Sequence, residues 1–190
     1  LVPIQILWVN LVTDGLPAIA LGVDPQDEST MKRPPRRADE GIFSGGLQYR
    51  IFAQGIAIGV CTVSAFVLSL FFSRNIETAR TICFSTLTFS QLLFVFFCRS
   101  EEVQSLRSGF LGNSWLVGAV GTSALLQLGV IYIPFLNGVF NTVYLHMHDW
   151  YIVGVCSLAS VVVPMTIRLA MVGSGKGTRV PVAKEEITVY

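Results

Sequence analysis

Long apolar runs dominate the chain and alternate with short polar stretches. A helix that crosses a bilayer needs about 20 mostly apolar residues. Five runs reach or approach this length, at 1–23, 51–72, 81–98, 114–133 and 150–172. The pattern predicts an all-α fold, a polytopic transmembrane bundle of about five spanning helices that fills residues 1–172. A polar loop at 24–50 and a polar tail at 173–190 complete the expected organisation.

The third run is more polar than the other four. Its middle part carries several hydroxyl and amide residues, Ser85, Thr86, Thr88, Ser90 and Gln91. Side chains of these types form hydrogen bonds between helices inside membranes. We therefore expect this run to be a packed or functional helix inside the bundle rather than a lipid-facing one.

The composition agrees with a membrane protein. Hydrophobic residues make up 52% of the chain and charged residues 13%, and the mean hydropathy is +0.62. A soluble domain carries roughly a quarter charged residues. No basic patch is interleaved with exposed aromatic residues, so nucleic acid is not an expected partner. Membrane lipid is the expected surrounding.

Lysine and arginine are distributed unevenly among the connections. They gather in 24–50, in 99–113 and at the end of the chain, whereas the other connections hold only Arg74 and Arg80. The positive-inside rule predicts that the three basic segments are cytoplasmic, so that the first run enters from the outer side. The first run starts at once, without the basic region of a secretory signal. We expect a fragment whose earlier helices are missing.

Asp14 is the only carboxylate in the first run. A charged residue at membrane depth is costly and usually faces an ion path or a polar cavity. On an α-helix, Asn10, Thr13 and Asp14 share one face through their i, i+3, i+4 spacing. Gly15 and Pro17 follow, and Pro17 removes a backbone donor. The first helix is therefore predicted to be unwound here, as in transporters that bind cations at broken helices.

The three side chains offer an amide carbonyl, a hydroxyl and a carboxylate, all hard oxygen donors. Calcium takes about six to eight such oxygens, so the remaining ligands of a calcium site must come from elsewhere. The alternative is that Asn10 and Asp14 form a hydrogen-bonded pair between helices. Gln91 is a further candidate, either as a metal ligand or as a hydrogen-bonding residue between helices.

Two other motifs are weaker indications of a binding site. His146, His148 and Asp149 form an H-x-H-D cluster of a kind that can bind zinc or copper. We expect an interfacial, solvated cluster instead, because the i, i+2 spacing suits a loop. The stretch 173–178 imitates a phosphate loop but lacks its first glycine and the hydroxyl residue after Lys176, which indicates a flexible tail. No arrangement of Ser, Cys, His or paired acids predicts a catalytic centre.

The motif N-x-x-T-D-G-x-P at 10–17, followed by M-K-R-P-P-R at 31–36, resembles the sixth membrane helix and following loop of P-type calcium-transporting ATPases. The stretch 84–92 is similar to the C-terminal region of the same family. The resemblance covers the whole chain and is strongest over 3–37. It implies that the chain is the C-terminal transmembrane region, helices six to ten, of such a pump, of a bacterial kind located in the plasma membrane.

The resemblance also implies roles for single residues. Asn10 and Asp14 match ligands of the calcium site nearer the cytoplasm, and Thr13 and Asp14 match those of the second site. Gln91 stands where endoplasmic-reticulum pumps carry glutamate and where many bacterial pumps carry glutamine. We therefore expect one calcium per cycle, bound by Asn10 and Asp14 with Thr13 and Gln91 in supporting roles.

The phosphorylated D-K-T-G-T motif of the family is absent from these 190 residues, as are its nucleotide-binding segments. ATP and Mg²⁺ thus belong to the parent protein, whose remaining helices and cytoplasmic domains are the expected partners. The fragment alone is expected neither to hydrolyse ATP nor to pump. The alternatives are a pump for Mn²⁺ or Na⁺, which Thr13 disfavours, and a non-enzymatic ion carrier or scaffold, which the lack of an internal repeat disfavours.

Overall fold

The computed structural model describes residues 1–23, 47–73, 75–99 and 113–173, and the secondary structure of this part of the chain is helical throughout. Three consecutive segments, α1, η1 and α2, form one continuous helix, Pro3–Gly22, which we call the first spanning helix. The elements are α1 (Pro3–Val9), η1 (Asn10–Gly15), α2 (Leu16–Gly22), α3 (Leu47–Ser73), α4 (Ile76–Arg99), α5 (Ser114–Tyr132), α6 (Pro134–Phe140) and α7 (Met147–Gly173). Five of the helices so formed are long and apolar enough to cross a membrane, which confirms the predicted all-α bundle.

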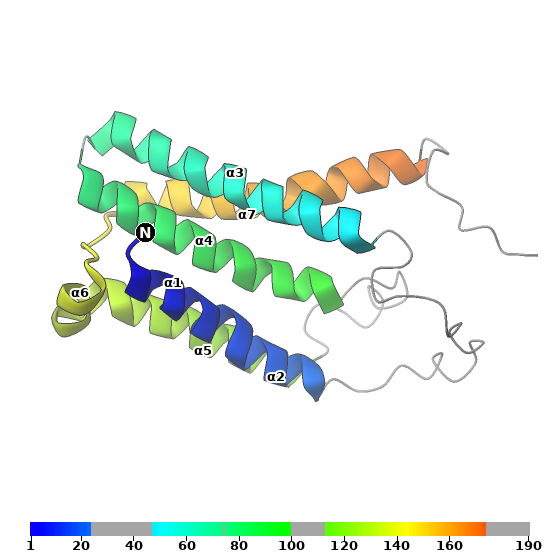
Figure 1. Cartoon of the computed structure of the whole chain (residues 1–190), viewed down its shortest axis with the longest axis horizontal. Coiled ribbons are helices and arrows are strands. Elements are labelled where there is room, and N and C mark those ends of the chain that lie inside the picture. Colours follow the sequence, from blue (N-terminus) through cyan, green and yellow to red (C-terminus); the bar gives the residue numbers. More distant parts are fainter. Residues whose placement is uncertain (24–46, 74, 100–112, 174–190) are drawn as a thin grey trace, which may run out of the picture.

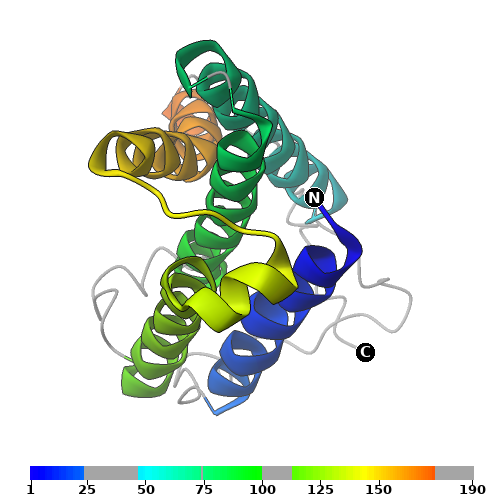
Figure 2. The same cartoon turned by 90° about the vertical axis from the view of Figure 1, so that its left-hand side faces the viewer.

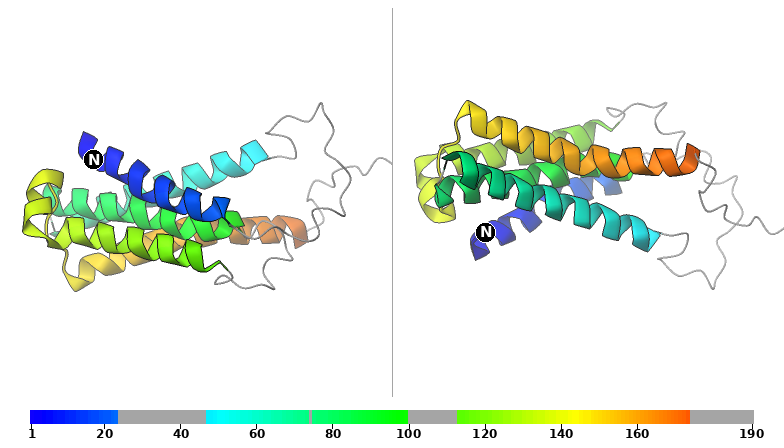
Figure 3. Two further views of the ribbon diagram at one scale, coloured as in Figure 1. Left: turned by 90° about the horizontal axis from the view of Figure 1, so that it is seen from below. Right: turned by 90° about the horizontal axis from the view of Figure 1, so that it is seen from above.

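The spanning helices lie side by side and alternate in direction (Figure 1). The end of α2, the start of α3, the end of α4, the start of α5 and the end of α7 lie together at one end of the bundle. The start of α1 and the whole of α6 lie at the other end, as the two views in Figure 3 also show. The helix ends that flank the basic stretches of the sequence therefore share one side, as the charge distribution predicted.

Three helices, among them α7 at Met147, begin earlier than the apolar pattern indicated. α3 starts at Leu47 and α4 at Ile76, so the helices continue past the apolar runs into polar sequence. At the start of α4, the side-chain oxygen of Asn75 accepts a hydrogen bond of 2.9 Å from the Glu77 N–H. Such a cap satisfies a helix terminus where the surroundings are wet. The hydrophobic pattern shows the membrane-embedded length and does not mark where the helix ends.

The short helix α6 lies in a connection that the sequence pattern left without an element. Pro134 occupies its first turn, where a missing N–H costs no hydrogen bond. It ends at Asn141, whose φ of 50° and ψ of 47° place it in the left-handed region that often terminates helices. Figure 2 looks from the end of the bundle at which α1 begins. There α6 lies across the end of α5 and the start of the first spanning helix.

α4 is the central helix of the bundle. One core cluster joins its residue Ile82 to Ala65 of α3 and Val153 of α7. A second cluster joins its residue Phe84 to the first spanning helix, α5 and α6. Half of the most apolar window of α4 is buried, against 17–33% for the other spanning helices. This confirms the prediction that the most polar run packs inside the bundle.

Hydroxyl residues of α4 are accommodated in this interior because they bond to their own helix. Thr81, Ser85 and Thr88 each donate to the carbonyl four residues earlier, at 2.8–3.0 Å. Their polar hydrogens therefore need no partner from a neighbouring helix. Other hydroxyl side chains of α4 have no such bond to their own helix.

Replacing Phe84 should show how much the packing of α4 contributes to the stability of the bundle. Phe84 is fully buried between α4 and its neighbours, so Phe84→Ala leaves a cavity and is expected to cost about 3–5 kcal/mol of stability. Phe71→Ala is the matched control, since Phe71 is 78% exposed. Thermal unfolding in detergent measures both variants. Equal midpoints for the two would contradict the central position of α4.

Candidate cation site

The first spanning helix departs from α-helical geometry where the sequence predicted an interruption. Residues Asn10–Gly15 form a π-helical stretch, and the helix continues through it without a break. The predicted unwinding is thus realised as a wider turn, of the kind frequently found at functional sites. Pro17 lies in the first turn of α2 and cannot donate a backbone hydrogen bond, which explains why the irregularity lies just before it.

The sequence predicted that Thr13 shares a helix face with Asn10 and Asp14. The structure contradicts this prediction. The Thr13 side chain is buried, and its hydroxyl donates to the Val9 carbonyl at 2.7 Å. Asn10 and Asp14 are exposed. The reason is the wider turn, because a spacing of three residues no longer returns to the same side of a π-helix. The Oγ1 of Thr13 nevertheless lies 3.3 Å from Oδ1 of Asp14, so these two oxygens are brought together.

Asn10 and Asp14 lie on a surface that is otherwise apolar. Leu7 and Leu11 beside them are 69% and 64% exposed. Within the described residues, neither Asn10 nor Asp14 has a side-chain hydrogen bond to another helix, so the alternative of an interhelical pair receives no support. A carboxylate at this depth needs a polar cavity, an ion or another protein segment beside it.

Gln91 lies on α4, which packs against η1 and α2. Its Oε1 is buried and accepts no hydrogen bond from the part of the chain that the structure describes. The same holds for the hydroxyl oxygens of Thr86 and Ser90 on the same helix. A buried oxygen without a partner is costly, so this segment of α4 has unmet capacity for a donor, a water or a cation. No hydrogen bond joins Gln91 to Asn10, Thr13 or Asp14.

Three hydrogen bonds at different levels join the first spanning helix to α5 and its N-cap residue Asn113, and we call these three bonds the brace. The Trp8 Nε1–H donates to Gln127 Oε1 at 3.1 Å. The Ser123 hydroxyl donates to the Val12 carbonyl at 2.8 Å, and the Asn113 amide donates to the Ala20 carbonyl at 3.1 Å. Successive contacts run in opposite directions along the two helices, as an antiparallel pair requires.

The sequence reasoning missed the brace. Gln127 is the only amide in its apolar run, and that isolation is a signal that could have identified it. Ser123 gives no comparable signal, because serine is common in membrane helices and usually bonds to its own backbone. Asn113 also caps α5 by accepting from the Leu116 N–H at 3.0 Å, so it combines a local role with an interhelical one.

The cluster at the opposite end of the bundle is built around a buried acid. Asp149 accepts from the His146 N–H at 2.9 Å, and its other oxygen lies 3.0 Å from Nε2 of His148. The two imidazole rings are exposed and stacked, with centroids 5.9 Å apart. No group of three metal-ligating residues that could hold an ion occurs among the described residues. The geometry supports a helix cap at the start of α7 with solvated histidines.

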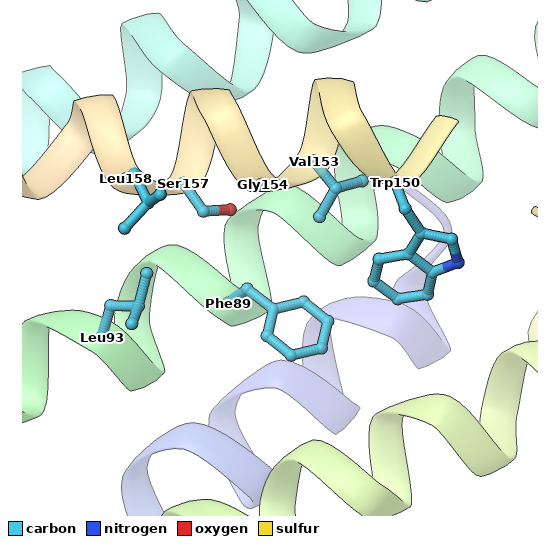
Figure 4. Close-up of a pocket in the computed structure, with 7 residues that line it drawn as sticks. All are labelled: Phe89, Leu93, Trp150, Val153, Gly154, Ser157 and Leu158. Carbon is cyan, nitrogen blue, oxygen red and sulfur yellow. The ribbon is translucent and has the colours of Figure 1, made fainter. Parts of the chain in front are cut away.

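An apolar pocket of about 240 Å³ opens between α4 and α7 (Figure 4). Phe89 and Trp150 lie at one end of it, with their rings edge-to-face and the ring centroids 5.7 Å apart. Ser157 also lines it, but its hydroxyl donates to the Thr86 carbonyl. The pocket includes none of the predicted ion-binding residues, so it is separate from the candidate site.

Two sequence interpretations lie outside the described residues. The basic cluster at 32–37 belongs to the undescribed stretch 24–46. The imitation of a phosphate loop falls almost entirely in 174–190.

Five helices that are long and apolar enough to cross a membrane define an integral, multi-pass membrane protein, and the first of them is irregular at Asn10–Gly15. The chain belongs to the family of cation-transporting ATPases: the model of their C-terminal region matches residues 1–170. This confirms the resemblance seen in the sequence.

Several curated relatives support the same assignment. A calcium-transporting ATPase of Bacillus subtilis is 49% identical over 156 residues, which cover 80% of this chain and 17% of the relative. Calcium-transporting ATPase 1 of Bacillus cereus is 39% identical over 184 residues, which cover 88% of this chain and 21% of the relative. A calcium-transporting ATPase of Listeria monocytogenes is 32% identical over 167 residues, which cover 87% and 19%. The chain thus spans about a fifth of the length of these relatives.

Asn113 provides a test of the brace. Asn113→Ala removes both the cap of α5 and the bond to the Ala20 carbonyl, and is expected to cost about 1–2 kcal/mol of stability. Asn113→Ser keeps a good capping side chain but is too short to bridge the helices, so it should cost less. Thermal unfolding in lipid nanodiscs compares the two. An unchanged midpoint for Asn113→Ala would refute the structural role of this residue.

Proposed function

We propose that the chain is the ion-binding transmembrane segment of an ATP-driven calcium pump and provides part of its intramembrane Ca²⁺ site. The observation that carries this proposal is the π-helical stretch Asn10–Gly15, which leaves the oxygens of Asn10 and Asp14 on an uncovered membrane-embedded surface. Its family membership supports cation transport, and the names of the relatives support calcium.

The donor set suits a hard cation. Asn10 supplies an amide oxygen and Asp14 a carboxylate, and calcium prefers ligands of both types. The surface that bears them is apolar and open in this chain, so further helices of a longer parent protein fit against it and supply the missing oxygens. The parent's remaining helices and cytoplasmic domains are thus the proposed partners.

Thr13 has a supporting role in this proposal. Its hydroxyl donates to the Val9 carbonyl at 2.7 Å and lies within donating distance, 3.3 Å, of Asp14 Oδ1. The hydroxyl thus supports the position of the Asp14 carboxylate and keeps its oxygen close to it. It also holds the turn of η1 against the preceding helix.

Gln91 supplies a neutral oxygen from α4. Its buried Oε1 has no partner within the described residues, which fits an oxygen that awaits a cation or its bound water. A neutral amide compensates less positive charge than a carboxylate does. We therefore propose one calcium ion per cycle, with Asp14 as the charged ligand that this chain contributes.

The hydrolysis of ATP, with Mg²⁺, is assigned to cytoplasmic domains of the parent protein. These 190 residues contain no D-K-T-G motif, so the fragment alone is proposed to be inactive in both hydrolysis and transport. The proposed location is the plasma membrane of a bacterium, as the identity with Bacillus proteins supports.

A pump for Mn²⁺ or Na⁺ is the nearest alternative, because both ions also bind oxygen ligands. Competition separates the cations: uptake of radioactive calcium that is unaffected by excess Na⁺ and only weakly inhibited by Mn²⁺ supports calcium. A non-enzymatic carrier or scaffold is disfavoured by membership of an ATPase family.

Asp14→Asn in the full-length protein should abolish calcium-dependent phosphorylation by ATP. The substitution keeps the size of the side chain but removes the one charge that the first spanning helix offers to the ion. Glu77→Gln is the control, since Glu77 is exposed at the start of α4 and should not affect the reaction. Radioactive phosphate incorporation measures both variants. A normal phosphoenzyme level in Asp14→Asn would refute its role as a ligand.

Gln91→Glu should raise the apparent calcium affinity or the number of calcium ions transported per ATP. The change adds a negative charge to an oxygen that lies on the helix packed against η1. Gln54→Glu is a matched control in α3, where the buried amide donates to the Ser160 carbonyl at 3.0 Å. If Gln91→Glu changes neither quantity, Gln91 is not part of the site.

A further inference from the structure

The carbonyl of Val12 has an unusual position in the first spanning helix. In a π-helix the carbonyl of residue i accepts from the N–H of residue i+5. For Val12 that residue is Pro17, which has no N–H. Val12 is buried, with 2% of its surface exposed. A buried carbonyl without a donor is costly in a membrane, where water cannot replace the missing bond.

Ser123 of α5 supplies the missing donor. Its hydroxyl donates to the Val12 carbonyl at 2.8 Å, and its side chain is fully buried. Several buried hydroxyls in the bundle bond to their own helix, as Ser160 does to the Ser157 carbonyl at 2.7 Å, whereas Ser157 donates to the Thr86 carbonyl of another helix. Ser123 also donates across helices, to a carbonyl 111 residues away in the sequence, and its acceptor is the one that Pro17 leaves without a backbone donor.

The location of this bond ties it to the candidate ion ligands. Val12 lies between Asn10 and Asp14 in the π-helical stretch. A bond that draws its carbonyl toward α5 fixes the rotation of the stretch about its axis. The other two members of the brace, at Trp8 and Ala20, hold the helix outside η1. Ser123 is therefore the member of the brace that acts on η1 itself.

We propose that Ser123 is a positioning residue of the calcium site: its hydroxyl bond to the Val12 carbonyl holds η1 in the orientation that presents Asn10 and Asp14. This inference rests on the proposed function of these two residues. Loss of the bond frees η1 to adopt other hydrogen-bond patterns, which lowers the population of the binding-competent orientation. The strength of interhelical hydrogen bonds in membranes corresponds to an affinity loss of about three- to tenfold.

The experiment uses the full-length protein in lipid vesicles and measures ATPase activity against calcium concentration. Ser123→Ala should raise the calcium concentration for half-maximal activity about three- to tenfold while the maximal rate is kept, within the strength of one such bond. Ser160→Ala is the matched control, because it also removes a fully buried serine hydroxyl, and should leave this concentration unchanged. Equal curves for the two variants would overturn the proposal.

A double-mutant cycle separates positioning from general packing. Pro17→Ala restores a backbone N–H that can reach the Val12 carbonyl. Ser123→Ala should then have a smaller effect on calcium affinity in the Pro17→Ala background than in the wild type. If Ser123→Ala impairs folding, Pro17→Ala should rescue it. Additive effects, or misfolding in both backgrounds, would contradict the proposal.

Asp14→Asn distinguishes failure of this inference from failure of the proposed function. If calcium-dependent activity survives Asp14→Asn, the proposed calcium site itself is wrong. If Asp14→Asn abolishes activity while Ser123→Ala behaves like Ser160→Ala, the site stands and only the role of Ser123 is rejected.

Discussion

The structure depends on one constraint: inside a bilayer, each backbone carbonyl and N–H needs a partner from the protein. Pro17 breaks this rule within the first spanning helix because it has no N–H. The helix responds with a π-helical stretch, and Ser123 of α5 donates to the carbonyl that remains. The same widened turn leaves Asn10 and Asp14 exposed while Thr13 turns inward. The missing N–H of Pro17 thus accounts for the irregularity on which the proposed cation site is based.

The remainder of the bundle holds this irregular helix in place. α4 packs at the centre and joins the core clusters on both sides of it. α5 runs antiparallel to the first spanning helix and contacts it at Trp8, Val12 and Ala20 through the brace. Hydrogen bonds therefore fix the helix against α5, while the candidate ligands Asn10 and Asp14 are exposed.

Much of the fold could be predicted from the sequence because the bilayer imposes a length rule on apolar runs. The five spans, the central position of the polar helix and the place of the irregularity follow from this rule and from Pro17. The inward turn of Thr13 could not be predicted, because it depends on the change from an α-turn to a π-turn. The role of Ser123 was missed because its hydrogen-bond partner is a carbonyl far away in the sequence. The helix α6 was missed because it is too short to give a periodic hydrophobic pattern. The ligand roles of Asn10, Asp14 and Gln91 remain predictions.

The central claim is that this helix forms part of a calcium pathway driven by ATP. Uptake of radioactive calcium into sealed vesicles that contain the full-length protein tests it most directly. We expect uptake that requires ATP and is abolished when the vesicles are made permeable to calcium. An active ATPase that accumulates no calcium in such vesicles would contradict the account.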